Sequence, residues 1–217
     1  MNSAIILAAG SSKRFKGKSP KQYIEINGQQ ILDFAVSAFN SCELIDEIII
    51  VVASKYVNEI KKTYPDFTVI QGGKSRKESS YLGLLACQKK TKNVLIHDAA
   101  RIFINDSLIK KCLNALSTYD AVTFATPMTD TIARYTGNKI IKMENRDELV
   151  AIQTPHGFNY LKLLNSHENF INDASDDIRI MLEDNHTCIF LEGPEENIKI
   201  TKNSDLKRIL KFMEIKT

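Results

Sequence analysis

The chain has 217 residues, of which 43% are hydrophobic and 25% charged, so it can bury a proper core and is predicted to form one large domain, alone or with a small appendage. A formal net charge of +3 is too small to indicate nucleic-acid wrapping. The cysteines Cys42, Cys87, Cys112 and Cys188 include no close pair of the kind that a zinc site or redox motif requires. Free buried thiols in a reducing cytoplasm are therefore expected.

The N-terminal apolar run, residues 4–8, predicts a buried strand that leads into a basic loop. The run precedes the positive charges, which reverses the order of a secretory signal, and no later run is long enough to cross a bilayer. We therefore expect a soluble cytoplasmic protein that binds no membrane. The loop carries five cations and no acid: Lys13, Arg14, Lys16, Lys18 and Lys21. Such a loop suits a polyphosphate, and a solvated basic loop is the alternative.

Two well-known phosphate loops are excluded by their spacing. The dinucleotide fingerprint needs three glycines at fixed offsets, and only Gly10 is suitably placed. The P-loop pattern fails at Gly17-Lys18-Ser19, because its first glycine would fall at Ser12. It fails at Gly73-Lys74-Ser75 as well, because Thr68 stands at that place. An oxidoreductase of the dinucleotide-binding type is therefore disfavoured.

Short runs rich in β-branched residues alternate with segments of helical periodicity. The predicted strands are 4–8, 48–52, 68–70, 94–96, 121–124, 188–191 and 198–201. Between them, apolar residues at helical spacing form stripes around Leu32, Leu84 and Ile109. This alternation indicates an α/β domain with a mainly parallel sheet that helices cover on both faces.

The alternation lapses between about residues 127 and 151. Turn residues at Gly137-Asn138 predict a β-hairpin arm, over about residues 128–150, that protrudes from the sheet. A two-stranded hairpin is poorly stable alone, so we expect it to dock onto another subunit. A surface excursion without a partner is the alternative.

Ligands of an open α/β sheet gather at the carboxyl ends of its strands, where glycine, acid, base and hydroxyl residues accumulate in this chain. Gly72-Gly73 lets the backbone approach a flat or anionic ligand, and Ser79 lies near a helix start whose amides can receive an anion; a simple tight turn is the alternative. Asp98 is a candidate for binding magnesium or a ribose, and the alternative is an ion pair with Arg101. His97 is expected to satisfy a core hydrogen bond rather than to catalyse.

Nine motifs, spread in order from end to end, carry a family resemblance. They are Leu7-Ala8-Ala9-Gly10 through Arg14, Pro20-Lys21-Gln22-Tyr23, Gly72-Gly73 with Arg76 and Ser79, His97-Asp98-Ala99-Ala100-Arg101, Asp130-Thr131, Arg146, Gln153-Thr154-Pro155, Ser175-Asp176-Asp177 and Asn197-Ile198-Lys199-Ile200-Thr201. On these motifs the chain resembles the 2-C-methyl-D-erythritol 4-phosphate cytidylyltransferase family of the non-mevalonate isoprenoid pathway. The resemblance implies a Rossmann-like nucleotidyltransferase fold and a homodimer joined through the arm.

The resemblance also implies a reaction, in which the phosphate of a sugar-alcohol monophosphate attacks the α-phosphorus of CTP and releases pyrophosphate, with Mg²⁺ as the cofactor. Its implied catalytic residues are Arg14, Lys21 and Lys199. Its implied CTP-binding residues are Ala8, Ala9, Gly10, Gly73, Ser79, Asp98 and Ala99, with Asp98 also beside the metal. Its implied acceptor-binding residues are Thr131, Arg146, Thr154, Ser175 and Asp176, the first two serving the neighbouring subunit.

The chain departs from the usual family pattern mainly on the acceptor side. The departures are Ala133 for lysine, followed by Arg134, His156 for glutamine, Ile102 for proline, Ser175 for threonine and Lys74 at an often acidic position. The ribitol-5-phosphate cytidylyltransferase family, which uses the same chemistry, is an alternative, but it usually has Ala-Gly-Gly where this chain has Ala8-Ala9-Gly10. An alternative of another class is a regulatory protein that binds a nucleotide without catalysis.

Overall fold

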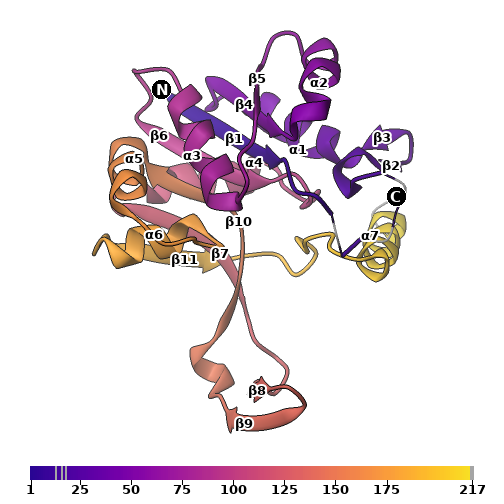
Figure 1. The fold of residues 1–217 in the computed structure, drawn as a ribbon, viewed down its shortest axis with the longest axis vertical. Helices are drawn as coiled ribbons and strands as arrows, with labels where there is room; N and C mark the ends of the chain where they lie inside the picture. Colours follow the sequence, from indigo (N-terminus) through magenta and orange to yellow (C-terminus); the bar gives the residue numbers. More distant parts are fainter. Residues whose placement is uncertain (13, 16, 18, 216–217) are drawn as a thin grey trace.

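The computed structural model of the chain describes residues 1–12, 14–15, 17 and 19–215, and at its centre is a seven-stranded sheet with the order β11-β7-β10-β6-β1-β4-β5 (Figure 1). The strands are β1 Asn2–Ala8, β4 Glu47–Val52, β5 Thr68–Gln71, β6 Asn93–Asp98, β7 Ala121–Pro127, β10 Val150–Asn159 and β11 Cys188–Glu192. Strand β10 is antiparallel to both neighbours, and the other pairings in this sheet are parallel. The predicted α/β class with a mostly parallel sheet is confirmed.

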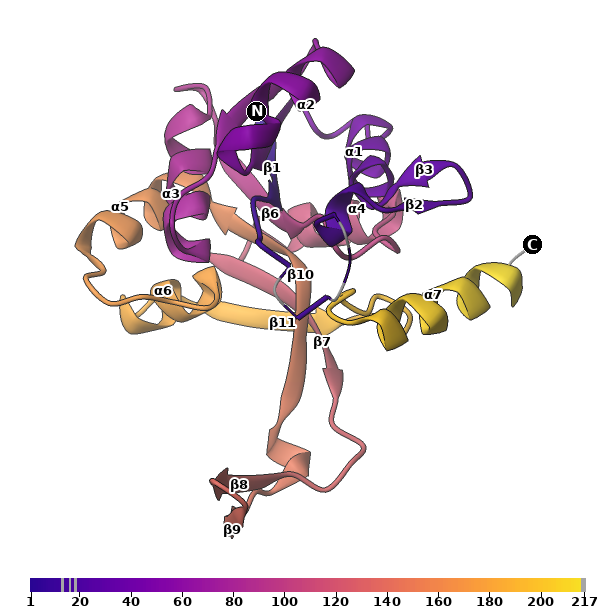
Figure 2. The same ribbon diagram turned by 45° about the vertical axis from the view of Figure 1, so that its right-hand side comes forward.

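Helices cover both faces of the sheet (Figure 2). They are α1 Ile31–Asn40, α2 Val57–Thr63, α3 Arg76–Ala86, α4 Asp106–Ala115, α5 Tyr160–Asn169, α6 Asp177–Glu183 and α7 Asn203–Ile215, with short 3₁₀ turns η1 Lys21–Tyr23, η2 Ser54–Tyr56 and η3 Arg146–Glu148. Alternate residues of β1 point to opposite faces, so Ile6 packs with α1, α2 and α4, whereas Ile5 packs with α3, α5 and α6. Burying one such isoleucine contributes about 1.5–3 kcal/mol to stability.

A third apolar cluster fastens the C-terminal segment against the loop that follows β1. Phe15 from that loop packs with Ile200 and with Ile209 of α7, near the small hairpin β2 Glu25–Ile26 and β3 Gln29–Gln30. The predicted strand at 198–201 is wrong, because this segment is irregular. Ile200 donates its backbone N–H to the carbonyl of Ala100 over 2.9 Å, and this contact brings the segment to the end of β6.

Strand β10 was not among the predicted strands, although it lies inside the sheet, between β7 and β6. Its residues from Gln153 to Phe158 are buried, and they include a threonine, a proline, a histidine and a glycine. Its register against β7 shifts between Gln153 and Gly157, so the strand is interrupted near its middle. Within the interrupted part, the hydroxyl of Thr154 accepts the backbone N–H of Asp98, at the carboxyl end of β6.

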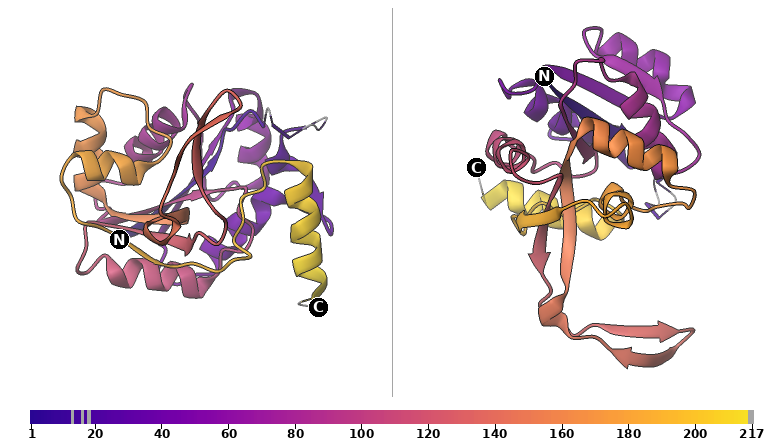
Figure 3. Two further views of the ribbon diagram at one scale, coloured as in Figure 1. Left: turned by 90° about the horizontal axis from the view of Figure 1, so that it is seen from below. Right: turned by 90° about the vertical axis from the view of Figure 1, so that its left-hand side faces the viewer.

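The arm leaves the sheet between β7 and β10 and ends in a hairpin far from the body of the molecule (Figures 1 and 3). The hairpin consists of β8 Ala133–Thr136 and β9 Lys139–Met143, and Gly137 in the turn has a φ of +58°. The predicted hairpin around Gly137-Asn138 is therefore confirmed. Its apolar side chains are open to solvent, with Tyr135 74% and Ile140 70% exposed. In the described part of the chain, no helix has the length and apolar character needed to cross a membrane.

Candidate active site

A cleft of about 540 Å³ opens at the carboxyl ends of β1 and β6. All the residues predicted to be catalytic or to bind CTP line this one cleft: Ala8, Ala9, Gly10, Arg14, Lys21, Gly73, Ser79, Asp98, Ala99 and Lys199. Most of them come together because parallel strands deliver their following loops to the same edge of the sheet. Lys199 instead comes from the irregular segment that the Ile200–Ala100 hydrogen bond attaches to the end of β6. Of the basic loop, Lys13, Lys16 and Lys18 lie outside the described residues.

The loop after β1 is shaped by a buried glutamine that the site prediction left out. Gln22 donates from Nε2 to the carbonyl oxygens of Ala8, over 2.6 Å, and Gly10, over 3.1 Å. Its Oε1 accepts from the hydroxyl of Ser12, which in turn accepts from the backbone N–H of Lys21 over 3.1 Å. Gln22 thus ties both ends of the loop together, and its place beside Lys21 in the second motif was the one signal of this role in the sequence.

The two catalytic lysine candidates reach the cleft from opposite ends of the chain. The ammonium of Lys21 donates to the carbonyl oxygen of Ile200. Burial lowers the pKa of Lys21 to about 8, and the nearby cations Lys199 and Arg14 act in the same direction. The positive charges of Lys21, Lys199 and Arg14 therefore repel one another when no anion is bound.

Asp98 is the one carboxylate among the described residues that line the cleft. Its Oδ2 lies 2.6 Å from Nζ of Lys199, and its Oδ1 lies 3.7 Å from Nε of Arg76. Burial opposes ionisation of Asp98, but Lys199 and Arg76 outweigh it and hold the pKa of the carboxyl well below its usual range. The alternative of an Asp98–Arg101 ion pair is wrong, because the Arg101 guanidinium donates to the carbonyls of Asn197 and Ile152 instead.

The Gly72-Gly73 pair brings backbone close to its surroundings. A Cβ at Gly72 would lie 2.5 Å from Cβ of Ala9, and one at Gly73 would lie 2.2 Å from Cγ of Glu78, so neither position has room for a side chain. The Gly73 N–H donates to Oγ of Ser79, in the first turn of α3. Both positions require glycine because the backbone there lies too close to Ala9 and Glu78 to leave room for a Cβ.

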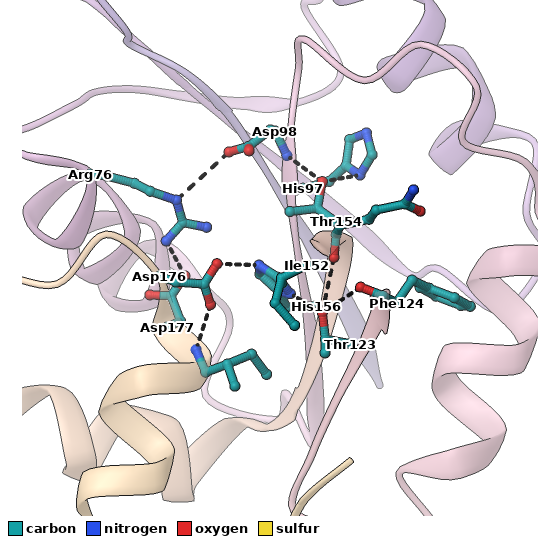
Figure 4. A network of polar contacts seen from close by, with 12 residues as sticks. Arg76, His97, Asp98, Thr123, Phe124, Ile152, Thr154, His156, Asp176 and Asp177 are labelled. Atoms are coloured by element: carbon teal, nitrogen blue, oxygen red, sulfur yellow. Dashed lines mark hydrogen bonds and ion pairs between the residues drawn. The ribbon is translucent and has the colours of Figure 1, made fainter. Parts of the chain in front are cut away.

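His97 and Thr154 form a buried polar contact next to Asp98 (Figure 4). Burial lowers the pKa of His97 to about 4, so the ring is neutral near pH 7. Because Nε2 faces the Arg101 carbonyl over 2.9 Å, it carries the proton, and Nδ1 accepts from the Thr154 hydroxyl. The same hydroxyl accepts from the Asp98 backbone N–H. The predicted role of His97 as a core hydrogen-bonding residue is confirmed.

None of the predicted acceptor residues, Thr154 included, is among the described residues that line this cleft. Ser175 is exposed, and Asp176 precedes α6, which it caps by accepting the Ile178 N–H over 2.8 Å. Thr131 and Arg146 are on the arm, where Arg146 donates to the carbonyl of Thr129 over 2.7 Å. The chain's own fold does not bring these two to its cleft, and their acceptor role stays a prediction.

Comparisons with known proteins decide the family. The family model described as IspD, 2-C-methyl-D-erythritol 4-phosphate cytidylyltransferase, matches residues 2–214. The chain belongs to this family. Membership confirms the resemblance predicted from the motifs, and it makes the chain a member of a family of nucleotidyltransferases.

Relatives of the family match along nearly the whole chain. A 2-C-methyl-D-erythritol 4-phosphate cytidylyltransferase of Clostridium botulinum (strain Langeland) is 36% identical, and the match covers 94% of each chain. A bifunctional enzyme IspD/IspF of Pelagibacter ubique is also 36% identical, and the match covers 98% of this chain. The chain spans only 58% of the length of that relative. The crystal structure of a 4-diphosphocytidyl-2C-methyl-D-erythritol synthase from Anaerococcus prevotii superimposes with a TM-score of 0.85 at 29% identity, covering 98% of this chain and 96% of that one.

One residue of the cleft has the chemistry of a ligand for a divalent cation, the cofactor that the family resemblance predicts. No group of three His, Cys, Asp or Glu side chains comes together in the described parts of the chain, so the residues there provide no complete metal cage. Asp98 supplies one hard carboxylate in the cleft. Magnesium is usually bound by one or two carboxylates together with substrate phosphates, and the donor set suits that arrangement.

Arg76 is a further residue that the site prediction left out. It lines the cleft, and its Nη1 lies 2.6 Å from Oδ2 of Asp177, whose Oδ1 lies 2.9 Å from Nε2 of His167 (Figure 4 shows the Arg76 contacts). Burial opposes the charge of Asp177, but Arg76 and His167 hold its pKa well below the usual range. Arg76 therefore joins the cleft, at Asp98, to the beginning of α6.

Proposed function

We propose that this chain transfers a cytidylyl group from CTP to 2-C-methyl-D-erythritol 4-phosphate and releases pyrophosphate, a step of isoprenoid biosynthesis. The observation that carries the proposal is the group of cations Arg14, Lys21 and Lys199 around one cleft, in a chain that matches the family from residue 2 to residue 214. The reaction needs such cations, because two polyanions must meet and negative charge builds up at the α-phosphorus.

Arg14, Lys21 and Lys199 stabilise the transition state by charge rather than by proton transfer. The acceptor's phosphate is already ionised at neutral pH, so no protein nucleophile or general base is required. The Ile200 carbonyl and the Asp98 carboxylate hold the ammonium groups of Lys21 and Lys199 in place before CTP binds. Cations fixed in this way lose little freedom when the charge develops.

The nucleotide lies against the small residues of the cleft. Ala8, Ala9, Gly10, Gly73 and Ser79 surround the cytidine and phosphates, and their small size leaves room for the ligand. Asp98 and Ala99 lie beside the ribose. Mg²⁺ is the proposed cofactor, held by Asp98 and the triphosphate, and it would neutralise phosphate charge when bound.

The acceptor binds between the body of one chain and the arm of another. Thr154, Ser175 and Asp176 contribute from the body, and Thr131 and Arg146 from the arm of the second subunit. The exposed apolar hairpin supports a homodimer joined through the arm, because a patch of this kind on a protruding element marks an interaction site. Light scattering on the purified protein measures its molar mass and so tests the proposed homodimer, which a monomer at assay concentrations would contradict.

The proposed setting is the cytoplasm. Cys42, Cys87, Cys112 and Cys188 are all free thiols, as a reducing compartment favours. The substrates are small molecules, and neither nucleic acid nor a membrane is a proposed partner.

One assay tests the activity. Purified protein with Mg²⁺ and CTP is offered methylerythritol phosphate or ribitol phosphate, and pyrophosphate release is measured. We expect release with methylerythritol phosphate, the substrate named in the matching family. Faster pyrophosphate release with ribitol phosphate would show that ribitol phosphate is the acceptor. CTP binding without pyrophosphate release from either acceptor would favour a nucleotide-binding regulatory protein.

A further inference from the structure

His156 is fully buried in the middle of β10 and connects that strand to two other segments (Figure 4). Its Nδ1 lies 2.7 Å from Oγ1 of Thr123 on β7, and its Nε2 lies 2.9 Å from Oδ2 of Asp176. A buried histidine with partners on both nitrogens has a fixed ring orientation. The position departs from the family's usual glutamine, and nothing in the reaction proposed above uses it.

The direction of the hydrogen bond to Asp176 follows from the partners. Burial raises the pKa of Asp176, but the neighbouring His156 and Arg76 outweigh it and lower the pKa below its usual value. The carboxylate is therefore ionised and can only accept hydrogen bonds. Nε2 of His156 must therefore carry a proton and donate. Oγ1 of Thr123 also lies 2.9 Å from the Gln153 carbonyl and 3.3 Å from the Phe124 carbonyl, so its one proton goes to one of these carbonyls or to Nδ1. In each arrangement Nε2 still donates to Asp176.

Asp176 is consequently held at both of its oxygens. Oδ1 accepts the backbone N–H of Ile178 over 2.8 Å, and Oδ2 accepts from His156. The side chain nevertheless stays 29% exposed, so the carboxylate keeps lone pairs that face solvent. A fixed, ionised and partly open carboxylate is suited to accept hydrogen bonds from the hydroxyl groups of a polyol.

We propose that His156 is a positioning residue for the acceptor: it orients the Asp176 carboxylate, which accepts hydrogen bonds from the hydroxyl groups of the sugar alcohol. This inference rests on the proposed function and identifies the hydrogen bond, from His156 to Asp176, on which acceptor recognition depends. His156 itself touches no substrate. Its effect is confined to the acceptor, because its two side-chain partners are Thr123 and Asp176 rather than residues that line the CTP cleft.

The test compares His156→Leu with His156→Gln. Leucine removes the donor to Asp176, whereas the amide of glutamine can donate to Asp176 and accept from Thr123. We expect His156→Leu to raise KM for methylerythritol phosphate about 10- to 100-fold, the range for losing one hydrogen bond to a charged group, and to leave KM for CTP within about twofold. His156→Gln should stay within about threefold of the wild type for both substrates.

A matched control is His186→Leu, because His186 also pairs with carboxylates, those of Asp120 and Asp184, but lies in a more exposed setting. It should change neither KM. A thermal melt shows which variants fold. Should His156→Leu not fold, His156→Asn takes its place, because its shorter amide keeps polarity but does not reach Asp176, and the same rise in acceptor KM is expected.

A second measurement asks whether His156 acts through Asp176. In an Asp176→Asn background, the substitution of His156 should add little further change in the acceptor KM, whereas independent roles would give additive effects. Equal increases in both KM values, an unchanged acceptor KM in a folded variant, or a glutamine variant as impaired as leucine would each overturn the inference. If the wild type itself releases no pyrophosphate with CTP and methylerythritol phosphate, the proposed function fails and this inference falls with it.

Discussion

The pH dependence of turnover is expected to report the charge of Lys21. Because burial and neighbouring cations lower the pKa of Lys21 to about 8, the free protein holds this ammonium below that pH and loses it above. The second ionisation of a phosphate monoester lies near pH 6, so the substrates do not change charge in that range. The value of kcat/KM, which reports the free enzyme, should therefore fall as the pH rises through about 8.

The size of the fall follows from two quantities. With a pKa of about 8, roughly nine-tenths of Lys21 is charged at pH 7 and roughly one-tenth at pH 9, so kcat/KM should drop about tenfold over those two units. Losing one transition-state donor costs about 3 kcal/mol, or about a hundredfold in rate. The profile should thus approach a plateau near a hundredth of its maximum only above about pH 10, where the charged fraction of Lys21 becomes smaller than the residual rate.

The assay is the initial rate of pyrophosphate release at CTP concentrations well below KM, from pH 6.5 to 10. Lys21→Arg keeps a cation at every pH, so its profile should lose the step near pH 8. Lys21→Ala should run at about a hundredth of the wild-type rate at pH 7.5 and should show no such step. The reasoning is refuted if the alanine variant keeps the step, or if its rate at pH 7.5 equals that of the wild type.

Three further changes probe other parts of the molecule. Asp98→Asn removes the carboxylate that pairs with two cations of the cleft, Lys199 and Arg76. Without divalent metal, CTP should therefore bind more tightly, as measured by calorimetry, whereas turnover with Mg²⁺ should fall in the pyrophosphate assay. Arg146→Ala should raise KM for methylerythritol phosphate at least about tenfold and leave that for CTP unchanged in steady-state kinetics, and equal losses would contradict its acceptor role. Gly157→Ala would place a Cβ 2.5 Å from Sγ of buried Cys112, so urea unfolding should show a loss of about 1–3 kcal/mol.

The cleft at the carboxyl ends of β1 and β6 was predictable because its signals are local. A strand that ends in small residues, as β1 does at Ala8, delivers whatever follows to the rim of the sheet, and β6 does the same with Asp98. Knowing the strands and their direction is then enough to bring these residues together. The hairpin was predictable for the same reason, because Gly137 and Asn138 mark its turn within a few residues of both strands.

The rest depends on tertiary partners that spacing does not reveal. Strand β10 lacks an alternating pattern because both of its faces are buried against neighbours, and its interior contains Pro155 and Gly157. The segment around Ile200 has the β-branched composition of a strand, yet it packs against α7 instead of extending the sheet. The pairing of Arg76 with Asp177 joins residues 101 positions apart, and no periodicity predicts such a contact.

The cleft gathers positive charge and supplies each of three cations with an internal partner. Lys21 donates to a backbone carbonyl, Lys199 to Asp98, and Arg76 to a carboxylate at the start of α6. These partners keep the side chains in position, but one of them is a neutral carbonyl, and the depressed pKa of Lys21 shows that its charge is incompletely compensated. A bound polyphosphate would add the missing negative charge without rearranging the cations. We accordingly assign selectivity for the acceptor to the other side of Arg76, where His156 donates a hydrogen bond to Asp176.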